Sequence, residues 1–280
     1  LEEAMGQVLI TFEKKINDKQ LDVDVDMPEH PVYTIANKDY IDDLDKCITS
    51  IVEKSTYKNY EIIVVENNST DPNTFKYYDE VTKKYPQVKV VYWKGQGFNY
   101  SKINNFGFEA SRGEHIILLN NDIEILTPSW IEEMLMFSQR EDVGAVGAML
   151  YYPDDTIQHA GVIIGIGADP EMAVAGHSHK YFKRGEYGYA SRLCLAQNLS
   201  AVTAACIMIR ASVYKEVDGL DESFAVAFND VDLCLKIRKS GHLIVWTPFA
   251  EAYHYESKSR GLETTPEKVA RFNGEINNFL

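Results

Sequence analysis

One stretch of sequence decides the fold of this chain: Glu114-His115-Ile116-Ile117-Leu118-Leu119-Asn120-Asn121-Asp122-Ile123-Glu124. Its short, continuous apolar centre is typical of a buried strand in a parallel sheet. Open α/β sheets bind ligands just beyond the carboxyl ends of such strands, which is where the polar end of this stretch would lie. Asp122 offers hard carboxylate oxygens there, and these suit Mg²⁺ or Mn²⁺. An ordinary polar turn is the alternative, because Asn and Asp are common turn residues.

The composition is that of an ordinary globular protein. The chain has 280 residues, of which 45% are hydrophobic and 25% are charged, enough for one large α/β domain or two smaller ones. The formal net charge is -14, and no basic stretch stands out against it. This argues against nucleic-acid binding through phosphate neutralisation, although a local pocket for a nucleoside diphosphate is compatible with it.

Cysteine spacing and hydropathy indicate the compartment. The four cysteines are far apart, form no C-x-x-C pair and lie in apolar patterns, so we expect buried thiols in a reducing compartment. No run approaches the roughly 18 consecutive apolar residues of a membrane helix, and the N-terminus has no signal-peptide pattern. We therefore expect a cytoplasmic protein, at most peripherally associated with the inner face of a membrane.

Strand and helix patterns alternate from residue 31 onward. Strands are expected at 32–35, 61–65, 88–92, within the opening run 114–124, and at 143–150, 199–209 and 243–246, with helices between several of them. Such alternation predicts an α/β fold with a mostly parallel central sheet flanked by helices. We expect one domain over residues 31–261, with a C-terminal helix in 262–280 packed on it. Residues 7–13 could form a strand, but 1–30 as a whole reads as an N-terminal appendage or linker.

Five motifs follow one another in this region. They are Val65-Glu66-Asn67-Asn68-Ser69-Thr70-Asp71; Asn104-Asn105-Phe106-Gly107; Leu118-Leu119-Asn120-Asn121-Asp122; Gly219-Leu220-Asp221-Glu222-Ser223-Phe224 with Asn229-Asp230-Val231-Asp232-Leu233; and Pro248 with His254. Each motif alone is weak, but in this order they resemble the family 2 glycosyltransferases of the GT-A fold. The resemblance implies a Rossmann-like sheet and an inverting transfer of a sugar from a nucleoside diphosphate donor, UDP or dTDP. It further implies a saccharide or lipid-linked acceptor, cell-surface polysaccharide synthesis, and Mn²⁺ or Mg²⁺ as cofactor.

The same resemblance assigns the metal ligands. Asp122 corresponds to the second acid of the family's D-x-D motif, which binds the metal that bridges the two phosphates. Asn120 stands at the first position, where an amide oxygen brings no charge and is a poorer ligand than a carboxylate. His254 corresponds to the position that completes the metal shell, and imidazole suits Mn²⁺ better than Mg²⁺.

By resemblance, Asp230 is the catalytic base of the family's E-D-x-D-L motif, with Asn229 in place of the usual Glu. Inverting transfer needs a base to take the proton of the acceptor hydroxyl. The alternative for Asp230 is a helix N-cap, and the two roles are compatible. Asp232 is expected to be structural.

The nucleotide contacts are also implied by resemblance. The nucleoside is expected to lie across Asn37, Glu66 and Asn67, since an Asn side chain can both donate to and accept from a pyrimidine edge. Asn121 is expected beside the nucleotide. Lys102 and Arg260 are candidate diphosphate partners, Arg260 on a closing loop; the alternative for both is a solvated surface charge.

The acceptor side is the least informative. Glycines, histidines and aromatic residues replace regular patterns between 151 and 198, which is typical of loops that shape a pocket. We expect His159, His177, His179 and Thr203 to border it. A metal pair formed by His177 and His179 is a weaker alternative.

Two other functions compete with this interpretation. A nucleotidyltransferase would show a Gly-rich phosphate loop with Lys or Arg after its first strand, where this chain has Asn37-Lys38-Asp39. A nucleotide-sugar-binding module could have lost catalysis through Asn120 and Asn229.

Overall fold

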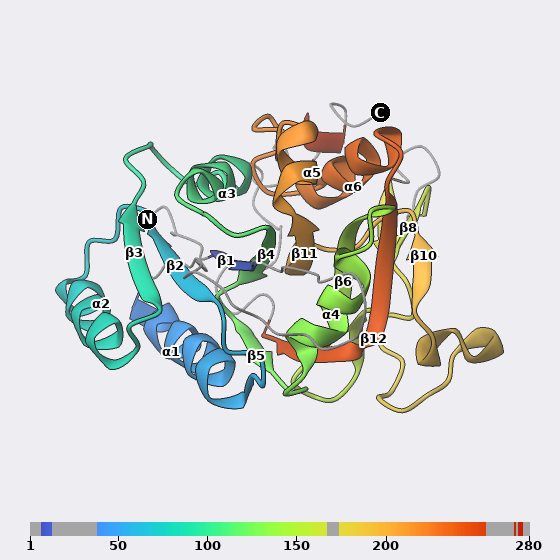
Figure 1. Cartoon of the computed structure of the whole chain (residues 1–280), viewed down its shortest axis with the longest axis horizontal. Coiled ribbons are helices and arrows are strands. Elements are labelled where there is room, and N and C mark those ends of the chain that lie inside the picture. Colours follow the sequence, from blue (N-terminus) through green and yellow to red (C-terminus); the bar gives the residue numbers. More distant parts are fainter. Residues whose placement is uncertain (1–6, 13–37, 167–173, 256–271, 273, 277–280) are drawn as a thin grey trace, which may run out of the picture.

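A central sheet crosses the molecule, with helices on both of its faces (Figure 1). The computed structural model describes residues 7–12, 38–166, 174–255, 272 and 274–276. The strand expected at 32–35 and the candidate site residues Asn37 and Arg260 lie outside these ranges.

Helices and strands alternate through the first half of the chain, as expected. The elements are β1 (Gln7–Phe12), α1 (Lys38–Lys54), β2 (Glu61–Glu66), α2 (Pro72–Lys84), β3 (Val88–Tyr92), α3 (Tyr100–Glu109), β4 (His115–Asn120), β5 (Ile123–Ile125), α4 (Trp130–Ser138) and β6 (Val143–Tyr151). The second half contains shorter elements before the alternation resumes. They are β7 (Ile157–His159), β8 (Val162–Ile164), β9 (Ala175–His177), the 3₁₀ segment η2 (Tyr189–Cys194), β10 (Gln197–Leu199), β11 (Cys206–Arg210), α5 (Ala211–Glu216), α6 (Asn229–Lys239) and β12 (Leu243–His254).

The main sheet has the strand order β10-β12-β6-β11-β4-β1-β2-β3. β2 is parallel to β3 and β6 to β12, while β1 and β11 are antiparallel to both of their neighbours. It follows that β2, β3, β4, β6 and β12 all run in one direction. The prediction of a mostly parallel sheet is confirmed, with β1, β10 and β11 as antiparallel members and the short strands β5 and β7 pairing antiparallel with β12 and β6. The carboxyl ends of the five co-directional strands therefore share one edge.

The position of β1 corrects the expected N-terminal appendage. Gln7–Phe12 is a strand inside the sheet, where Val8 pairs with Val64 of β2 and with Leu119 of β4. A place between two buried strands needs a segment whose backbone can hydrogen-bond on both sides. The apolar run Val8-Leu9-Ile10 has the strand propensity for that place.

Alternate residues of the central strands enter two hydrophobic cores. Ile62 and Val64 of β2 pack in the core on the side of α1, α2 and α4. Ile63 and Val65 pack in the core on the side of α3, α5 and α6. Burying both faces explains why these strands read as continuous apolar runs. Each fully buried large side chain contributes about 1.5–3 kcal/mol, so the two cores fix the sheet that carries the site.

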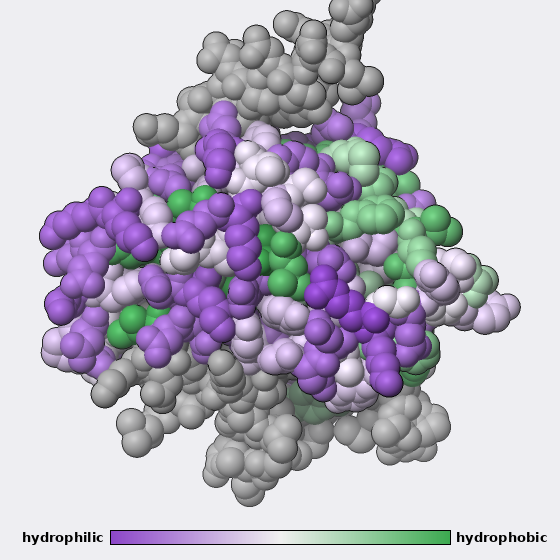
Figure 2. Space-filling view, turned by 90° about the horizontal axis from the view of Figure 1, so that it is seen from below, coloured by the Kyte–Doolittle hydropathy of each residue, from purple (hydrophilic) through white to green (hydrophobic). Residues whose placement is uncertain are grey.

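The segment between β6 and β11 lacks this double cover. Among its described residues, 152–166 and 174–205, five that are not glycine adopt positive φ, namely Asp155, His179, Tyr181, Ala190 and Ser191. It also holds most of the exposed large hydrophobic side chains, among them Tyr187 and Tyr189. Figure 2 shows a mostly hydrophilic surface on the side of α1 and α2, and hydrophobic atoms gathered toward the opposite side. The loosened sequence pattern of 151–198 is thus a region of loops and short strands.

The cysteines are all free, as expected. Cys47, Cys206 and Cys234 are buried, while Cys194 is partly exposed. Burial, with the nearby Asp122 carboxylate adding to it, raises the pKa of the Cys47 thiol well above its usual value. Among the described residues, no helix is both long and apolar enough to cross a membrane.

Candidate active site

Three predicted site residues end strands that run in the same direction. Glu66 is the last residue of β2, Asn120 of β4 and His254 of β12. Asp122 follows β4 by two residues and directly precedes β5, which pairs with β12 in the register Ile123 to His254. The backbone N–H of Tyr255 also donates to the carbonyl of Asp122 over 3.0 Å. This short ladder brings Asp122 and His254 to one point.

Asp122, Asn120 and His254 form a close donor cluster. His254 Nε2 lies 3.2 Å from Asp122 Oδ1 and 3.1 Å from Asn120 Nδ2. Both Asp122 and His254 are buried. The fold therefore brings the three proposed metal ligands together, although Asn120 and His254 are 134 positions apart in the chain.

Gln158 on β7 orients the imidazole. Its Oε1 lies 2.9 Å from His254 Nδ1 and can only accept, so Nδ1 carries the proton. In the neutral ring, Nε2 then presents a lone pair toward Asn120 and Asp122. A second partner of this kind fixes the tautomer of a metal-binding histidine. Sequence reasoning missed Gln158, because a Gln before a candidate histidine carries no motif signal.

This cluster fits a divalent cation. The imidazole lone pair and the Asp122 oxygen face each other at 3.2 Å, an arrangement that a cation between them would relieve. Asn120 Oδ1 is a buried acceptor with no hydrogen-bond partner among the described residues. The described residues nevertheless hold no group of three His, Cys, Asp or Glu side chains that could bind a metal. The cluster is therefore a partial donor set, and a nucleoside diphosphate would have to supply further oxygens.

Asp230 is held beside this cluster by one backbone segment. The N–H of Ala204 donates to Asp230 Oδ2 over 3.2 Å. The next carbonyl, that of Ala205, accepts from the N–H of Asn120 over 3.0 Å. The preceding N–H, that of Thr203, donates to His159 Nε2 over 3.4 Å. Residues 203–205 therefore link the metal cluster, the candidate base and the loop region, and only Thr203 was singled out from sequence.

Asp230 is not the N-cap of α6. Phe228 occupies that position with φ 61°, and no side chain caps the helix there. Asn229 is buried and donates through Nδ2 to the carbonyl of Val226 over 3.1 Å, so it braces the preceding loop. Asp232 lies 3.5 Å from Lys236 one turn on, consistent with the structural role expected for it. Burial raises the pKa of the Asp232 carboxyl.

Glu66 and Asn67 lie at the end of β2, where the nucleoside was expected. Both are buried. The Glu66 carboxylate accepts from Tyr78 Oη over 2.6 Å and from Ser69 Oγ over 2.9 Å, and also from the Ser69 N–H. Its oxygens thus hold the following turn in place. Asn67 Oδ1 accepts from the neighbouring Asn68, and Asn121 is buried with an amide Nδ2 that has no partner among the described residues.

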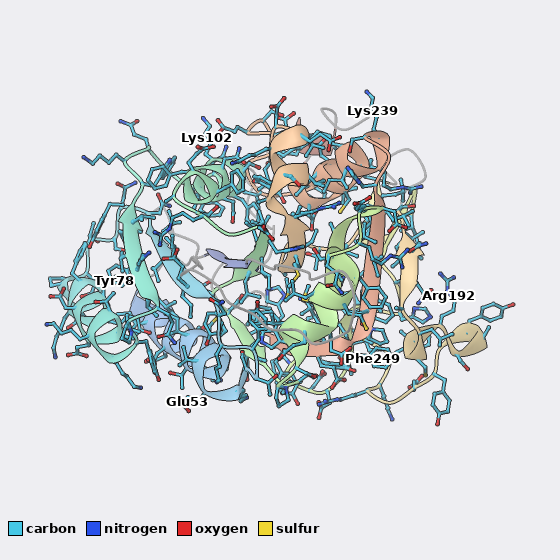
Figure 3. The ribbon with its side chains drawn as sticks, viewed as in Figure 1. Glu53, Tyr78, Lys102, Arg192, Lys239 and Phe249 are labelled. Carbon is cyan, nitrogen blue, oxygen red and sulfur yellow. The ribbon has the colours of Figure 1, made fainter. Side chains whose placement is uncertain are left out.

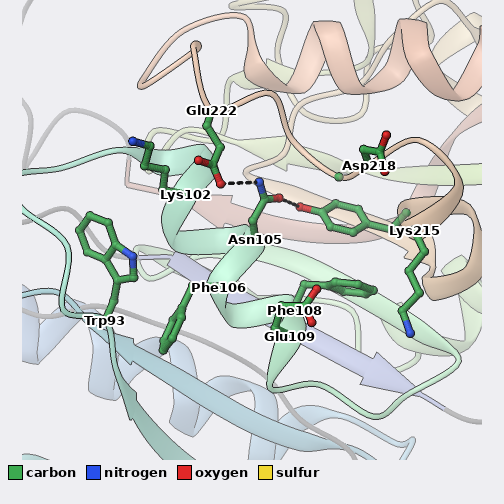
Figure 4. A pocket seen from close by; sticks show the side chains of 11 residues that line it. Trp93, Lys102, Asn105, Phe106, Phe108, Glu109, Lys215, Asp218 and Glu222 are labelled. Atoms are coloured by element: carbon green, nitrogen blue, oxygen red, sulfur yellow. Dashed lines mark hydrogen bonds between the residues drawn. The ribbon is translucent and has the colours of Figure 1, made fainter.

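Lys102 lies apart from the metal cluster. Its side chain is exposed and points outward from α3 (Figure 3). It lines a groove of 690 Å³ that also contacts Trp93, Tyr214 and Glu222, and that none of Asn120, Asp122, Asp230 or His254 lines (Figure 4). The expected contact of Lys102 with a diphosphate stays a prediction, as does its alternative of a solvated surface charge.

The Asn and Gly motifs beside that groove are structural. Asn105 Oδ1 accepts from Tyr214 Oη over 2.7 Å and from the Leu220 N–H over 3.0 Å. Gly219 has φ +60°, and a Cβ there would come within 2.7 Å of Asn105 Oδ1. These contacts join two of the five motifs across the chain.

The loop region contributes a histidine pair. His159 is completely buried, and its Nδ1 lies 2.8 Å from His177 Nδ1. Since Thr203 N–H donates to His159 Nε2, the Nδ1 of His159 carries the proton and donates to His177. Burial lowers the pKa of His159 well below its usual value. His179 Nδ1 lies 2.7 Å from Ser178 Oγ, and its ring packs edge-on against Phe182. The alternative metal pair of His177 and His179 stays a prediction.

Comparison with known proteins identifies the family. The family model described as glycosyl transferase family 2 matches residues 34–218, which is more than half of the chain. This chain belongs to glycosyl transferase family 2.

The curated relatives of this glycosyltransferase chain are longer proteins. It is 46% identical over 243 residues to the uncharacterized protein y4gI of Sinorhizobium fredii, a match that covers 86% of this chain and 26% of that protein. It is 35% identical over 234 residues to the O-antigen biosynthesis protein RfbC of Myxococcus xanthus, covering 82% of this chain and 18% of that protein. The chain thus spans about a quarter or less of these two relatives.

A third relative is more similar in size to this glycosyltransferase chain. The N-acetylglucosaminyl-diphospho-decaprenol L-rhamnosyltransferase of Mycobacterium tuberculosis is 22% identical over 235 residues, covering 77% of this chain and 73% of that protein. Among solved structures, GalNAc-T7 with UDP, GalNAc and Mn²⁺ superposes with a TM-score of 0.61 at 15% identity, covering 75% of this chain and 40% of the other. This likeness confirms the expected GT-A fold.

Proposed function

We propose that this glycosyltransferase domain is metal-dependent and inverting, and that it moves a sugar from a UDP- or dTDP-sugar to a saccharide or lipid-linked acceptor. The observation that carries the proposal is the 3.2 Å approach of His254 to Asp122, linked through residues 203–205 to Asp230. A metal site and a base so connected are the two groups that inverting transfer requires.

The relatives support a role in cell-surface polysaccharide synthesis, which we propose takes place at the cytoplasmic side of a membrane. One has the name O-antigen biosynthesis protein, another the name of a rhamnosyltransferase that acts on a decaprenol-linked sugar. The similar fold of GalNAc-T7 was solved with UDP and Mn²⁺. A UDP- or dTDP-sugar and a lipid-linked acceptor are therefore the substrate classes to test first.

Asp122 and His254 would hold the cation, with Asn120 Oδ1 as an additional neutral donor. When bound, a divalent cation stabilises the negative charge that develops on the departing diphosphate. Mn²⁺ suits the imidazole of His254 better than Mg²⁺ does. The fold would hold the Asp122 carboxylate and the His254 imidazole close enough to bind one cation, and Gln158 would fix the orientation of the imidazole.

Asp230 would act as the base. The acceptor oxygen forms a bond to the anomeric carbon while the bond from that carbon to the diphosphate oxygen breaks, and Asp230 takes the hydroxyl proton. The N–H of Ala204 donates to Asp230 Oδ2 over 3.2 Å and the N–H of Val231 donates to Oδ1 over 2.8 Å, so two backbone donors orient the carboxylate. The nucleoside diphosphate leaves with the bonding electron pair.

Asn67 and Asn121 would contact the nucleotide, and Glu66 would shape that pocket through Ser69 and Tyr78. The buried amide Nδ2 of Asn121 is available for such a contact among the described residues. Asn37 and Arg260 remain proposed contacts on the resemblance alone.

A nucleotide-sugar-binding module without catalysis is the second candidate. It is favoured by the incomplete donor set, in which Asn120 replaces a carboxylate and no third ionisable ligand joins Asp122 and His254 in the described residues.

Thermal unfolding with UDP, dTDP and GDP, each with and without Mn²⁺, tests the donor proposal. A ligand at 100 times its Kd stabilises the folded state by about 2.7 kcal/mol, which raises Tm by roughly 5–10 °C in a domain of this size. We expect UDP or dTDP to do so only with Mn²⁺. A response to GDP alone would contradict the pyrimidine preference.

Release of UDP or dTDP from the corresponding sugar nucleotides then separates the two candidates. An active glycosyltransferase releases the nucleotide slowly even to water, with Mn²⁺ present. Binding without any release would favour the module.

A further inference from the structure

The buried carboxylate of Glu275, near the C-terminus, accepts hydrogen bonds from the loop that precedes Asp230. Glu275 Oε1 accepts from the N–H of Val226 over 3.0 Å, and Oε2 accepts from the N–H of Ala227 over 3.0 Å. Glu275 is only 4% exposed, although it is ionisable. Carboxylates are seldom buried unless such partners satisfy them, so this contact is a specific one.

The gripped loop has an unfavourable backbone conformation. Phe228, the N-cap of α6, has φ 61°, which costs a non-glycine residue about 1–2 kcal/mol. Such a residue persists only where its surroundings over-determine it. Phe228 lies two residues before Asp230, and its ring contacts the ring of Phe272, with 5.4 Å between the ring centroids.

Three separate elements fix this loop. The N–H of Tyr100 at the start of α3 donates to the carbonyl of Ala225 over 2.7 Å. Asn229 donates to the carbonyl of Val226 from within α6. Glu275, near the C-terminus, accepts from the N–H groups of Val226 and Ala227. Among the described residues it is the only hydrogen-bond acceptor for these two N–H groups.

We propose that Glu275 is a positioning residue for the transfer reaction, acting through residues 226–228 on the placement of the Asp230 carboxylate. The proposal rests on the proposed function of Asp230. The loop enters α6 at Asn229, one residue before the base, so a shift of the loop rotates the first turn of the helix and moves the carboxylate away from the acceptor hydroxyl. The metal cluster is carried by β4, β5 and β12, which Glu275 does not contact in the described structure. Glu275 should therefore affect the chemical step and leave donor binding alone.

The decisive variants are Glu275→Gln and Glu275→Ala. Gln keeps the shape but has one acceptor oxygen for two N–H donors, whereas Ala removes both acceptors. The matched control is Ile276→Ala, which removes a buried side chain of the same segment and leaves the carboxylate in place. Glu80→Gln, at an exposed carboxylate on α2, controls for loss of a charge.

Kinetics would use the sugar nucleotide that the wild-type chain hydrolyses fastest from a panel of UDP-glucose, UDP-N-acetylglucosamine and dTDP-rhamnose, with Mn²⁺. A misplacement of about 1 Å can cost 10²-fold in rate, so we expect kcat to fall about 10- to 100-fold in Glu275→Ala and less in Glu275→Gln. The donor KM should stay within about twofold, the pattern of a lost transition-state interaction. Ile276→Ala should lower Tm but keep the wild-type kcat.

Equal losses of kcat in Ile276→Ala and Glu275→Ala would overturn the proposal, since any loosening of the segment would then suffice. So would an unchanged kcat in a folded Glu275→Ala protein, or a rise in donor KM that accounts for the whole effect.

Hydrogen exchange of the peptide 225–230 tests the hydrogen bonds of Glu275 to this loop independently of activity. We expect faster exchange of the Val226 and Ala227 amides in Glu275→Ala and not in Glu80→Gln. If the wild-type chain proved inactive, this arm would still report whether Glu275 orders the loop, so failure of the proposed function and failure of the positioning role give different results.

Discussion

The two halves of the proposed site, which we call the donor half and the acceptor half after the substrates proposed for them, are built in different ways. The donor half comprises the ends of β2, β4 and β12, where Glu66, Asn120 and His254 each close a strand of the doubly covered sheet. The acceptor half comprises the loops and short strands between β6 and β11, with His159 and His177 at 2.8 Å. One half has both faces buried in hydrophobic cores, and the other has several residues at positive φ.

The difference follows from what each half must recognise. Binding a diphosphate and a cation calls for fixed oxygen and nitrogen donors, which strand ends in a rigid sheet hold well. Recognising one particular acceptor calls for a surface that can vary, and loops on a rigid scaffold supply it. The two halves meet at residues 203–205, whose backbone groups contact His159, Asp230 and Asn120, and at Gln158 of β7, which contacts His254.

The largest effect is expected at the junction, from Asp230→Asn. The amide is nearly the same size but cannot take a proton, so transfer and hydrolysis should fall by about 10²–10⁴-fold, the usual contribution of general base catalysis. Nucleotide release measured against UDP binding tests this. Because Asp230 lies outside the donor half, UDP binding with Mn²⁺ should be nearly unchanged. Substantial residual turnover by Asp230→Asn would contradict the assignment of Asp230 as the base.

The next effect is expected within the donor half, from Asp122→Asn. Removing the carboxylate charge beside His254 should raise the Mn²⁺ concentration needed for UDP binding by about 10²–10³-fold. Calorimetric titration of UDP at several Mn²⁺ concentrations measures it.

The matched opposite change is Asn120→Asp, which adds a carboxylate to the same cluster. It should lower the Mn²⁺ requirement. If both substitutions left that requirement unaltered, the cluster of Asp122 and His254 would not be the metal site.

A smaller effect is expected from Gln158→Leu. Leu cannot accept the His254 Nδ1 proton, so the imidazole loses its fixed tautomer and orientation. Loss of such a supporting contact costs about 10- to 100-fold in metal affinity, and we expect the lower end because Asn120 still contacts Nε2. The titration used for Asp122 measures this as well. An unchanged Mn²⁺ dependence would mean that Gln158 does not support the site.

The smallest effect on the donor half is expected from His177→Ala. It removes the partner of His159 without touching β4, β5 or β12. UDP binding with Mn²⁺ should stay within about twofold of wild type, because one hydrogen bond is worth only about 0.5–1.5 kcal/mol and this one lies outside the donor half. A tenfold loss of UDP affinity would show that the two halves are not separate.

The donor half could largely be predicted because its signals are local. The apolar run before Asn120 and the carboxylate of Asp122 are both visible in a few consecutive residues. The alternation of strand and helix patterns along the chain predicted that this run is a strand of a mostly parallel sheet. The sequence carried no signal where position in space departs from position in the chain. Gln158 belongs to no motif, and the groove that Lys102 lines is visible only in the structure.

By itself, the sequence determined the alternation of strands and helices and the chemical character of the donor edge, because side-chain period and residue type act over a few residues. The GT-A class followed from the resemblance of its ordered motifs to a known family. Only the tertiary structure decided which distant groups meet. His254 reaches Asn120 across 134 positions, β1 enters the sheet antiparallel to its neighbours, and Glu275 grips the loop before Asp230. The reason is physical: such contacts depend on strand order and register, which no local pattern encodes.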